Sequence, residues 1–336
     1  MFPEYRDVFQ LSHTWGKFGK VRTLTNLKSG SSEFSIFAFT LGSNDPFVPH
    51  LIFTAGVHGL EKIGTQVALS FMHHIEARIS WDALLQEALK RVRISFVPLL
   101  NPIGMSRFQR SNGNGVDLMR NSPIQSSSAS LGVGGQSYSS KLPWYRGNAS
   151  QTHDGMEPES RSLVDWILEE TKDSACTLAL DLHSGFGSQD QLWFPYAKSR
   201  QAFHGIHQVH ALRELLDQVM PNHVYLFEPQ AKHYTTHGDL WDYLLFRVGP
   251  DRNFLPLTLE MGSWNWVRKN PLQFFSLLGP FNPVKPHRMK RAMRRHLPLF
   301  DFLVHSTASH PVWTKVDQDH HRKAALLRWP SIEASS

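Results

Sequence analysis

Short apolar runs, each bounded by glycine, proline or polar residues, recur along the chain and predict buried β-strands. They cover residues 35–41 (SIFAFTL), 51–54 (LIFT), 91–100 (RVRISFVPLL), 177–182 (TLALDL) and 255–259 (LPLTL). All but the first are followed by polar and glycine-rich residues. Loops beyond the carboxyl ends of strands in an open α/β sheet are held rigidly yet stay accessible. We therefore expect these four strand ends to converge on one crevice.

Helical periodicity separates the predicted strands. Apolar residues recur at close to helical spacing within residues 64–79, and residues 81–89 continue as helix. Another helix is predicted after Glu157, where proline and acidic residues precede an apolar pattern, and a further one near residues 211–219. The alternation of strands and helices predicts an α/β fold.

The chain shows no repeat and no charge-rich boundary between comparable halves. We therefore predict one domain over residues 1–305 and a C-terminal tail over residues 306–336, poorly ordered from Ser309 onward. Residues 121–159 are rich in serine and glycine and too polar to pack as a sheet strand. A loop of this length inside a domain is usually functional or disordered.

Composition narrows the class of protein. With 336 residues, 41% of them hydrophobic, the chain can bury a substantial core. Its one cysteine, Cys176, excludes an intrachain disulfide framework and is interpreted as a core thiol. The N-terminal segment lacks the pattern of a secretory signal. No apolar stretch approaches the roughly 20 residues needed to cross a bilayer, so the sequence predicts a soluble, cytoplasmic protein without a membrane partner.

The formal net charge of +6 is unevenly distributed. Residues 285–295 (KPHRMKRAMRR) carry six lysines or arginines, which we interpret first as a solvated helix face. Contact with nucleic acid or another anionic polymer is the alternative. No aromatic stacking motif accompanies the basic segment, which argues against a nucleic-acid partner.

Candidate metal ligands follow two of the predicted strands. His58 and Glu61 stand three residues apart after residues 51–54, and His183 directly follows residues 177–182. Two histidines and one glutamate are a standard ligand set for a catalytic zinc, which keeps one position for water. The sequence thus predicts one Zn²⁺ per chain. Asp117 is a candidate for the carboxylate that accepts the second N–H of a ligating imidazole.

The remaining chemistry comes from acidic and basic residues near the other strand ends. Glu260 directly follows residues 255–259 and is placed to act as general base and then general acid. An oxyanion formed during attack on an amide requires a fixed cation, for which Arg110 is a better candidate than Arg107. Arg120 could hold a substrate carboxylate by a bidentate contact.

Seven motifs in order, HGLE, NPIG, RSNGNGVDLMRN, MEPESRS, LDLHSG, HYTTHGD and LTLEMG, lie within about residues 51–262. As a set they resemble the zinc carboxypeptidases of the M14 type, particularly the short bacterial branch that includes murein peptide amidases. The resemblance implies an α/β three-layer sandwich with a mixed, about eight-stranded sheet flanked by helices. It also implies these roles: zinc ligands His58, Glu61 and His183, catalytic carboxylate Glu260, carbonyl polariser Arg110 and carboxylate anchor Arg120.

The resemblance implies that Tyr234 is a mobile residue that closes over substrate. Tyr243 is the alternative, because the loop before Gly238 is one residue shorter than the family pattern. Leu240 lies near the position that sets side-chain preference in the family. The family usually has asparagine where this chain has Met119, whose thioether cannot donate a hydrogen bond. Loss of that donor costs about 1–3 kcal/mol if the bound group is buried and charged, so strict exopeptidase specificity stays open.

The predicted function is a zinc-dependent, carboxypeptidase-like metallopeptidase that hydrolyses a peptide or amide bond near a C-terminal carboxylate, with a metal-activated water and Glu260. One alternative is a deacylase of N-acyl amino acids, resembling aspartoacylase and succinylglutamate desuccinylase. Those enzymes tend to carry a β-rich C-terminal domain, whereas the sequence after Glu260 predicts loops and a basic helix. Another alternative is an inactive scaffold that uses the basic segment 285–295, although such a protein would be expected to lose a ligand or the catalytic carboxylate.

Overall fold

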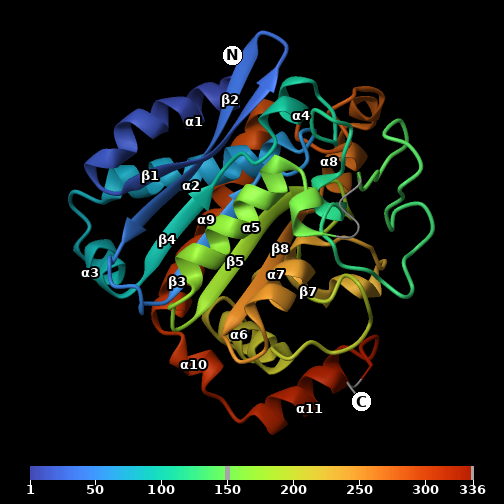
Figure 1. Ribbon diagram of the computed structural model, residues 1–336. Coiled ribbons are helices and arrows are strands. Elements are labelled where there is room, and N and C mark those ends of the chain that lie inside the picture. Colours follow the sequence, from blue (N-terminus) through green and yellow to red (C-terminus); the bar gives the residue numbers. More distant parts are fainter. Residues whose placement is uncertain (148–151, 334–336) are drawn as a thin grey trace.

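The computed structural model describes residues 1–147 and 152–333 (Figure 1). Its strands form one mixed eight-stranded sheet in the order β1-β2-β4-β3-β5-β8-β6-β7. They are β1 (Lys20–Ser29), β2 (Ser32–Gly42), β3 (His50–Ala55), β4 (Arg93–Val97), β5 (Thr177–Ser184), β6 (Gln191–Phe194), β7 (Leu226–Pro229) and β8 (Phe254–Met261). The four central strands are mutually parallel, and β2 and β6 pair with them in the antiparallel direction. The mixed, eight-stranded sheet confirms the predicted fold class.

Helices cover both faces of this sheet. They are α1 (Pro3–Thr14), α2 (Lys62–Arg78), α3 (Ala83–Arg91), α4 (Pro102–Ser106), α5 (Pro158–Thr171), α6 (Ile206–Val219), α7 (Leu240–Val248), α8 (Trp264–Lys269), α9 (Pro286–Ala308), α10 (Pro311–Thr314) and α11 (Gln318–Arg328). Helices α2 and α9 pack on one face, and α5 and α7 lie on the other (Figure 1). Short 3₁₀ turns occur at Trp15–Lys17, Leu118–Arg120, His153–Gly155, Gln230–Lys232 and Pro271–Phe275. In the described part of the chain, none of these helices combines the length and the apolar character that crossing a bilayer requires.

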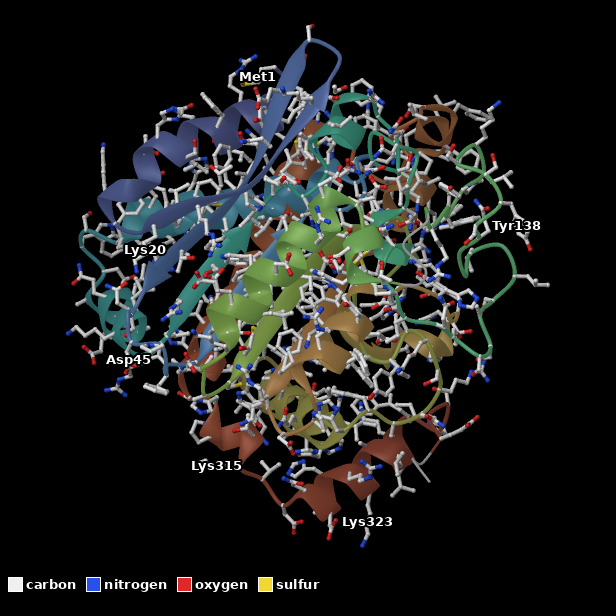
Figure 2. The ribbon with its side chains drawn as sticks, in the orientation of Figure 1. Met1, Lys20, Asp45, Tyr138, Lys315 and Lys323 are labelled. Carbon is white, nitrogen blue, oxygen red and sulfur yellow. The ribbon has the colours of Figure 1, made fainter. Side chains whose placement is uncertain are left out.

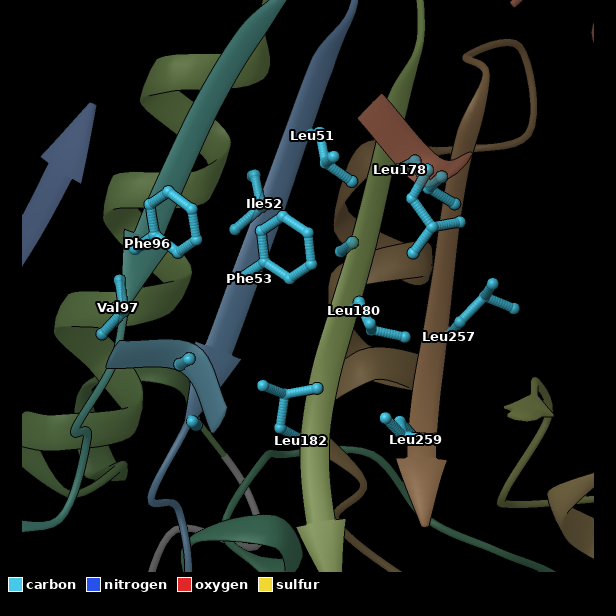
Figure 3. Close-up of a cluster of buried hydrophobic side chains, with 14 of the residues drawn as sticks. Leu51, Ile52, Phe53, Phe96, Val97, Leu178, Leu180, Leu182, Leu257 and Leu259 are labelled. Carbon is cyan, nitrogen blue, oxygen red and sulfur yellow. The ribbon is translucent and has the colours of Figure 1, made fainter. Parts of the chain in front are cut away.

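The central strands are apolar throughout because helices bury them on both sides. Every residue of β3, β5 and β8 is buried. Figure 3 shows side chains of these strands and of β4 packed side by side; Phe53 stacks on Phe96 with ring centroids 5.1 Å apart. This packing fixes the positions of the strand ends, on which the candidate site is built.

The strand order reverses between β3 and β5, since β4 lies on one side of β3 and β5 on the other. Such a reversal opens a crevice at the carboxyl edge of a parallel sheet. At this edge β3 is followed by Gly56, whose φ of 66° lies in the left-handed region. A Cβ there would meet Thr65 Oγ1 at 2.6 Å. Glycine therefore permits the sharp turn that carries the chain from β3 to His58 and Glu61.

The long polar loop over residues 121–159 is held at several points. Residues 148–151 lie outside the described residues. Elsewhere, Ser130 N donates to Thr235 O at 2.9 Å, and Gln136 forms an isolated bridge with Tyr145. Tyr138, labelled in Figure 2, lies at the outer side of the loop and is 89% exposed. The loop thus combines an exposed outer part with segments tied to the body of the protein.

The C-terminal segment differs from the expectation of a poorly ordered tail. Helices α10 and α11 follow Ser309, and both pack against α6. Trp313 is fully buried, and Trp329 Nε1 donates to Phe227 O at 2.8 Å. These two tryptophans bury apolar surface, although the sequence around them shows no regular apolar pattern that would predict it. The division of the chain into a domain and a tail at residue 305 stays a prediction.

Candidate active site

The ends of three neighbouring strands bring the two candidate histidines and two glutamates into one cavity of about 460 Å³. His58 and Glu61 follow β3, while His183 and Glu260 lie at the ends of β5 and β8. His183 and Glu260 are direct partners in the parallel pairing of β5 with β8. The sheet register itself therefore places the catalytic candidate beside a metal-ligand candidate.

One ligand atom from each of His58, Glu61 and His183 lies within 4.8 Å of the others. His183 Nδ1 is 3.1 Å from Glu61 Oε2, and Ser184 N donates to the same oxygen at 2.9 Å. All three side chains are about 3% exposed. His58 Nδ1 is buried and has no hydrogen-bond partner among the described residues. Buried imidazoles and a carboxylate that converge in this way form a donor set suited to zinc.

The loop that presents His58 is fixed by the NPIG motif. Asn101 Nδ2 donates to Val57 O at 3.1 Å, and Asn101 N donates to Gly56 O at 2.9 Å. Asn101 Oδ1 accepts from Gly104 N and so begins α4. One buried asparagine therefore joins the ends of β3 and β4, which holds the His58 loop in place.

Asp181, which was not selected from the sequence, fixes the ring of His183. Its carboxylate accepts hydrogen bonds from His183 Nε2 at 2.8 Å, Trp241 Nε1 at 2.9 Å and Thr54 Oγ1 at 2.8 Å. Residues i and i+2 of a strand share a face, so an aspartate two residues before a strand-end histidine is a usable sequence signal. With Nε2 bound to Asp181, His183 presents Nδ1 to Glu61. This is the carboxylate–histidine arrangement that orients metal ligands.

Charged groups of both signs crowd the site. Four buried carboxylates, Glu61, Asp117, Asp181 and Glu260, surround the two imidazoles together with two guanidiniums, Arg110 and Arg120. Burial alone would lower the pKa of His183, but the Asp181 and Glu61 carboxylates outweigh it and raise that pKa well above the ordinary value. Burial and the nearby Arg110 lower the pKa of His58. A pocket that attracts a proton so strongly has the charge to hold a divalent cation, so the residues fit a zinc ion.

Glu260 has the protonation behaviour expected of a group that accepts and returns a proton. Burial, reinforced by Glu61 and Asp181, raises its pKa to about 8, although His183 and Arg110 oppose the shift. Its Oε2 has no hydrogen-bond partner among the described residues. A pKa near neutrality suits general acid–base catalysis.

Arg110 lies on the cavity wall between two carboxylates. Its Nε donates to Asp117 Oδ2 at 2.9 Å, and its Nη1 is 3.7 Å from Glu61 Oε1. Asp117 Oδ1 lies 3.8 Å from His58 Nδ1. Asp117 thus lies beside a ligand candidate and orients Arg110, while the predicted hydrogen bond from the imidazole to Asp117 stays a prediction. Arg107, the weaker candidate, is exposed and bonded to Ser29 and Gly113 outside the cavity.

Arg120, Met119 and Tyr234 line the same cavity. Arg120 is 3% exposed and donates from Nε to Val133 O at 3.1 Å; no carboxylate of the described residues forms an ion pair with it. Its guanidinium lies over the Tyr234 ring, 5.7 Å from the centroid. Burial, reinforced by Glu260 and opposed by Arg120, raises the pKa of Tyr234. The hydroxyl therefore stays protonated and able to donate.

Two residues considered from the sequence do not reach the cavity. Leu240 is fully buried at the start of α7, and Tyr243 is bonded to His153 and Arg247 instead. The residues that line the cavity in addition to the predicted ones include Val133, Pro143 and Trp144 from the long polar loop, and Trp193, Gln230 and Thr258 from the sheet and its loops. Thr258 had a signal in the sequence, since it stands two residues before Glu260 on one strand.

A family model described as zinc carboxypeptidase matches residues 19–243. The chain belongs to this family. The match includes His58, Glu61, Arg110, Arg120 and His183 but ends before β8. The assignment of Glu260 as part of the zinc carboxypeptidase site therefore rests on the pairing of β5 with β8.

Relatives of known sequence are distant. The chain is 23% identical to carboxypeptidase SOL1 of Arabidopsis thaliana over 230 residues, which are 67% of this chain and 42% of that protein. It is 24% identical to the human carboxypeptidase N catalytic chain over 251 residues, which are 68% of this chain and 51% of that one. The chain thus spans about half the length of these curated relatives.

Solved structures share the zinc carboxypeptidase fold. Bovine thrombin-activatable fibrinolysis inhibitor, in complex with tick carboxypeptidase inhibitor, matches 94% of this chain and 99% of its own with a TM-score of 0.63 at 16% identity. Carboxypeptidase A of Helicoverpa armigera matches 90% of this chain and 71% of its own with a TM-score of 0.63 at 20% identity. These likenesses extend through nearly the whole described fold.

Replacing Asp181 with asparagine is expected to weaken zinc binding by roughly 10- to 100-fold, the usual cost of losing an outer partner of a metal ligand. The amide removes the charge that faces His183 Nε2 while keeping the side-chain shape. Zinc affinity measured by competition with a chelator tests this. Asp242→Asn is the matched control, because Asp242 is equally buried but binds the backbone of Ala197 and Lys198. Equal affinity in Asp181→Asn and the parent would contradict the role of Asp181.

Proposed function

We propose that this chain is a zinc-dependent metallopeptidase of the carboxypeptidase type, which hydrolyses the peptide bond next to a free C-terminal carboxylate. The observation that carries the proposal is the convergence of His58, Glu61, His183 and Glu260 with two arginines on one cavity. Family membership supports the zinc chemistry. The substrate class follows from how the two arginines are placed.

Zinc held by His58, Glu61 and His183 would supply a Lewis acid that lowers the pKa of water to about 7. Glu260 accepts the proton of the attacking water and returns it to the leaving amine. Its raised pKa favours both steps, because the group changes protonation state near neutral pH. Asp181 and Asp117 keep the site ordered by holding His183 and Arg110.

The two arginines have different roles because their surroundings differ. Arg110 is held by Asp117 and faces Glu61, so it is fixed beside the metal ligands, where it donates to the substrate carbonyl oxygen as negative charge develops. Arg120 has no carboxylate partner among the described residues and binds the substrate carboxylate. The protonated Tyr234 hydroxyl, close to Arg120, donates to the bound peptide.

The cavity wall supports a preference for an apolar terminal residue. Met119, Val133, Trp144, Trp193 and Phe281 contribute apolar surface. Apart from Glu61 and Glu260, no acidic side chain lines this cavity in the described chain. A cationic terminal residue would therefore lack a counter-charge, whereas an apolar residue buries surface against the aromatic rings.

The region after β8 favours the peptidase over an N-acyl amino acid deacylase. Deacylases that share these motifs are expected to carry a β-rich C-terminal domain. Here the described residues beyond Met261 form helices α8, α9, α10 and α11, with no further strand of the sheet.

The test is hydrolysis of a peptide mixture by the zinc-loaded chain, with the products read by mass spectrometry. We expect removal of single C-terminal residues, apolar ones fastest, and no cleavage when the carboxylate is replaced by an amide. Cleavage of N-acyl amino acids together with intact peptides would instead support the deacylase.

Replacing Arg120 with glutamine is expected to lower kcat/KM for peptides with a free carboxylate by roughly 10- to 100-fold, since a hydrogen bond to a charged group contributes about 1.5–3 kcal/mol. Steady-state kinetics with paired free and amidated peptides measure the effect. Arg107→Gln, an exposed arginine of the preceding loop, is the control and should match the parent. A uniform loss on both kinds of peptide would contradict carboxylate recognition by Arg120.

A further inference from the structure

A second cluster of potential metal ligands lies outside the cavity, between α6 and α11. His210 and Glu214 stand one turn apart on α6, and His321 lies on α11. His210 Nδ1 is 3.0 Å from His321 Nδ1, and Glu214 Oε2 is 3.7 Å from each of these nitrogens. The same three atoms thus form a closed triangle.

The size of this triangle matches a metal coordination sphere. Bonds of about 2.0–2.2 Å to a tetrahedral zinc place its ligand atoms roughly 3.3–3.6 Å apart. The observed separations of 3.0, 3.7 and 3.7 Å lie on either side of that range. Two histidines and a glutamate are also the donor set of the cavity triad, and the i, i+4 spacing on α6 is one that places two ligands on the same helix face.

The protonation of the cluster favours a metal. When two imidazole nitrogens face each other at 3.0 Å, only one can carry a proton between them, and both are good ligands when neutral.

The surroundings leave the ligands available. Arg213, the nearest cation on α6, is paired with Asp217. The side chains of His210 and His321 are 7% and 16% exposed, while that of Glu214 is 44% exposed. On α11, Ala325 is fully buried against the body of the protein, and Lys323 points to solvent (Figure 2). His321 thus lies at the partly covered junction of the two helices, which is open enough for an ion to enter.

We propose that His210, Glu214 and His321 form a second zinc site that fastens α11 to α6. Three protein ligands leave one position for water. The site is separate from the catalytic candidates, because none of its three residues lines their cavity. It joins α11, at the lower edge of the view in Figure 1, to α6, which lies between β6 and β7 in the sequence.

The test counts zinc bound by the full-length chain after loading and gel filtration. We expect the parent and His320→Gln to retain one more zinc per chain than His321→Gln, since His320 is the exposed neighbour on α11. Glu214→Gln is the second variant and should behave like His321→Gln. In addition, zinc should raise the melting temperature of Glu61→Gln, whose cavity triad is impaired, by more than it raises that of the Glu61→Gln, His321→Gln double variant.

The comparison of His321→Gln with His320→Gln does not depend on the cavity triad, so failure of the proposed function would leave it interpretable. A circular dichroism spectrum of His321→Gln that matches the parental spectrum shows that the variant is folded. If His321→Gln and Glu214→Gln both bind as much zinc as the parent, the second site is disproved. The same holds if zinc stabilises the double variant as strongly as it stabilises Glu61→Gln.

Discussion

Replacing Glu260 with glutamine is expected to lower kcat by roughly 10²–10⁴-fold, the contribution of a positioned general base, while zinc content stays unchanged. The amide keeps the size of the side chain but cannot take a proton from water. Glu260 is buried at the end of β8, where its partner in the strand pairing is His183. Single-turnover hydrolysis of a peptide substrate and metal analysis of the same sample measure both quantities.

Glu159→Gln is the matched control for this substitution. Glu159 is also a buried glutamate, 2% exposed, but it is bonded to Asn112 outside the cavity. We expect its activity to remain close to that of the parent. Full activity in Glu260→Gln would show that another group acts as the base, and loss of zinc from this variant would show that Glu260 is a ligand.

Replacing Glu61 with glutamine is expected to weaken zinc binding by more than roughly 100-fold. Loss of a residue that only hydrogen-bonds to a metal ligand costs up to about that much, and Glu61 is a ligand itself. Hydrolysis should be abolished at sub-saturating zinc. Glu61 Oε2 lies 3.1 Å from His183 Nδ1 and also accepts from Ser184 N. The substitution removes the charged ligand with little change in shape. Chelator competition gives the affinity, and titration with zinc should restore part of the activity.

Circular dichroism distinguishes this outcome from misfolding, because Glu61→Gln should keep the parental spectrum. Glu159→Gln serves again as the control for a buried glutamate and should bind zinc as the parent does. Parental zinc affinity and activity in Glu61→Gln would contradict the assignment of Glu61 to the metal.

The sequence predicts the centre of the fold well because its central strands are buried on both faces. The apolar runs at residues 51–54, 177–182 and 255–259 correspond to β3, β5 and β8, each fully buried. The polar residues that follow each run stand out against them. The positions of His58, Glu61, His183 and Glu260 could therefore be related to strand ends before their distances were known.

The edges of the fold gave weaker signals. Strand β1 pairs only with β2, and most of its residues are exposed or half-buried, so it lacks an apolar run. Helix α10 is only four residues long, and α11 begins with six polar residues, QDHHRK, and places Leu327 at the surface. Elements of this kind are stabilised by their contacts with the rest of the protein, which local patterns do not record.

The cavity wall shows the same limit for the site. Trp144 comes from the serine- and glycine-rich loop, where composition alone argued against a packed role, and it adopts a φ of 58° that is unusual for a non-glycine residue. Trp193 reaches the cavity from β6. The positions of these two side chains at the cavity wall depend on contacts between segments that are far apart in the sequence. Asp181, in contrast, could have been identified from the sequence, because it stands two residues before His183 on one strand and therefore lies on the same face.

The central claim is that the chain hydrolyses peptides with zinc bound to His58, Glu61 and His183. The most direct test measures bound zinc and release of C-terminal residues on one preparation, before chelation, after chelation and after zinc is returned. The account predicts hydrolysis that is lost with the metal and restored by zinc in the parent but not in Glu260→Gln. Unchanged hydrolysis by the metal-free chain, or a zinc-loaded chain that leaves every peptide intact, would contradict it.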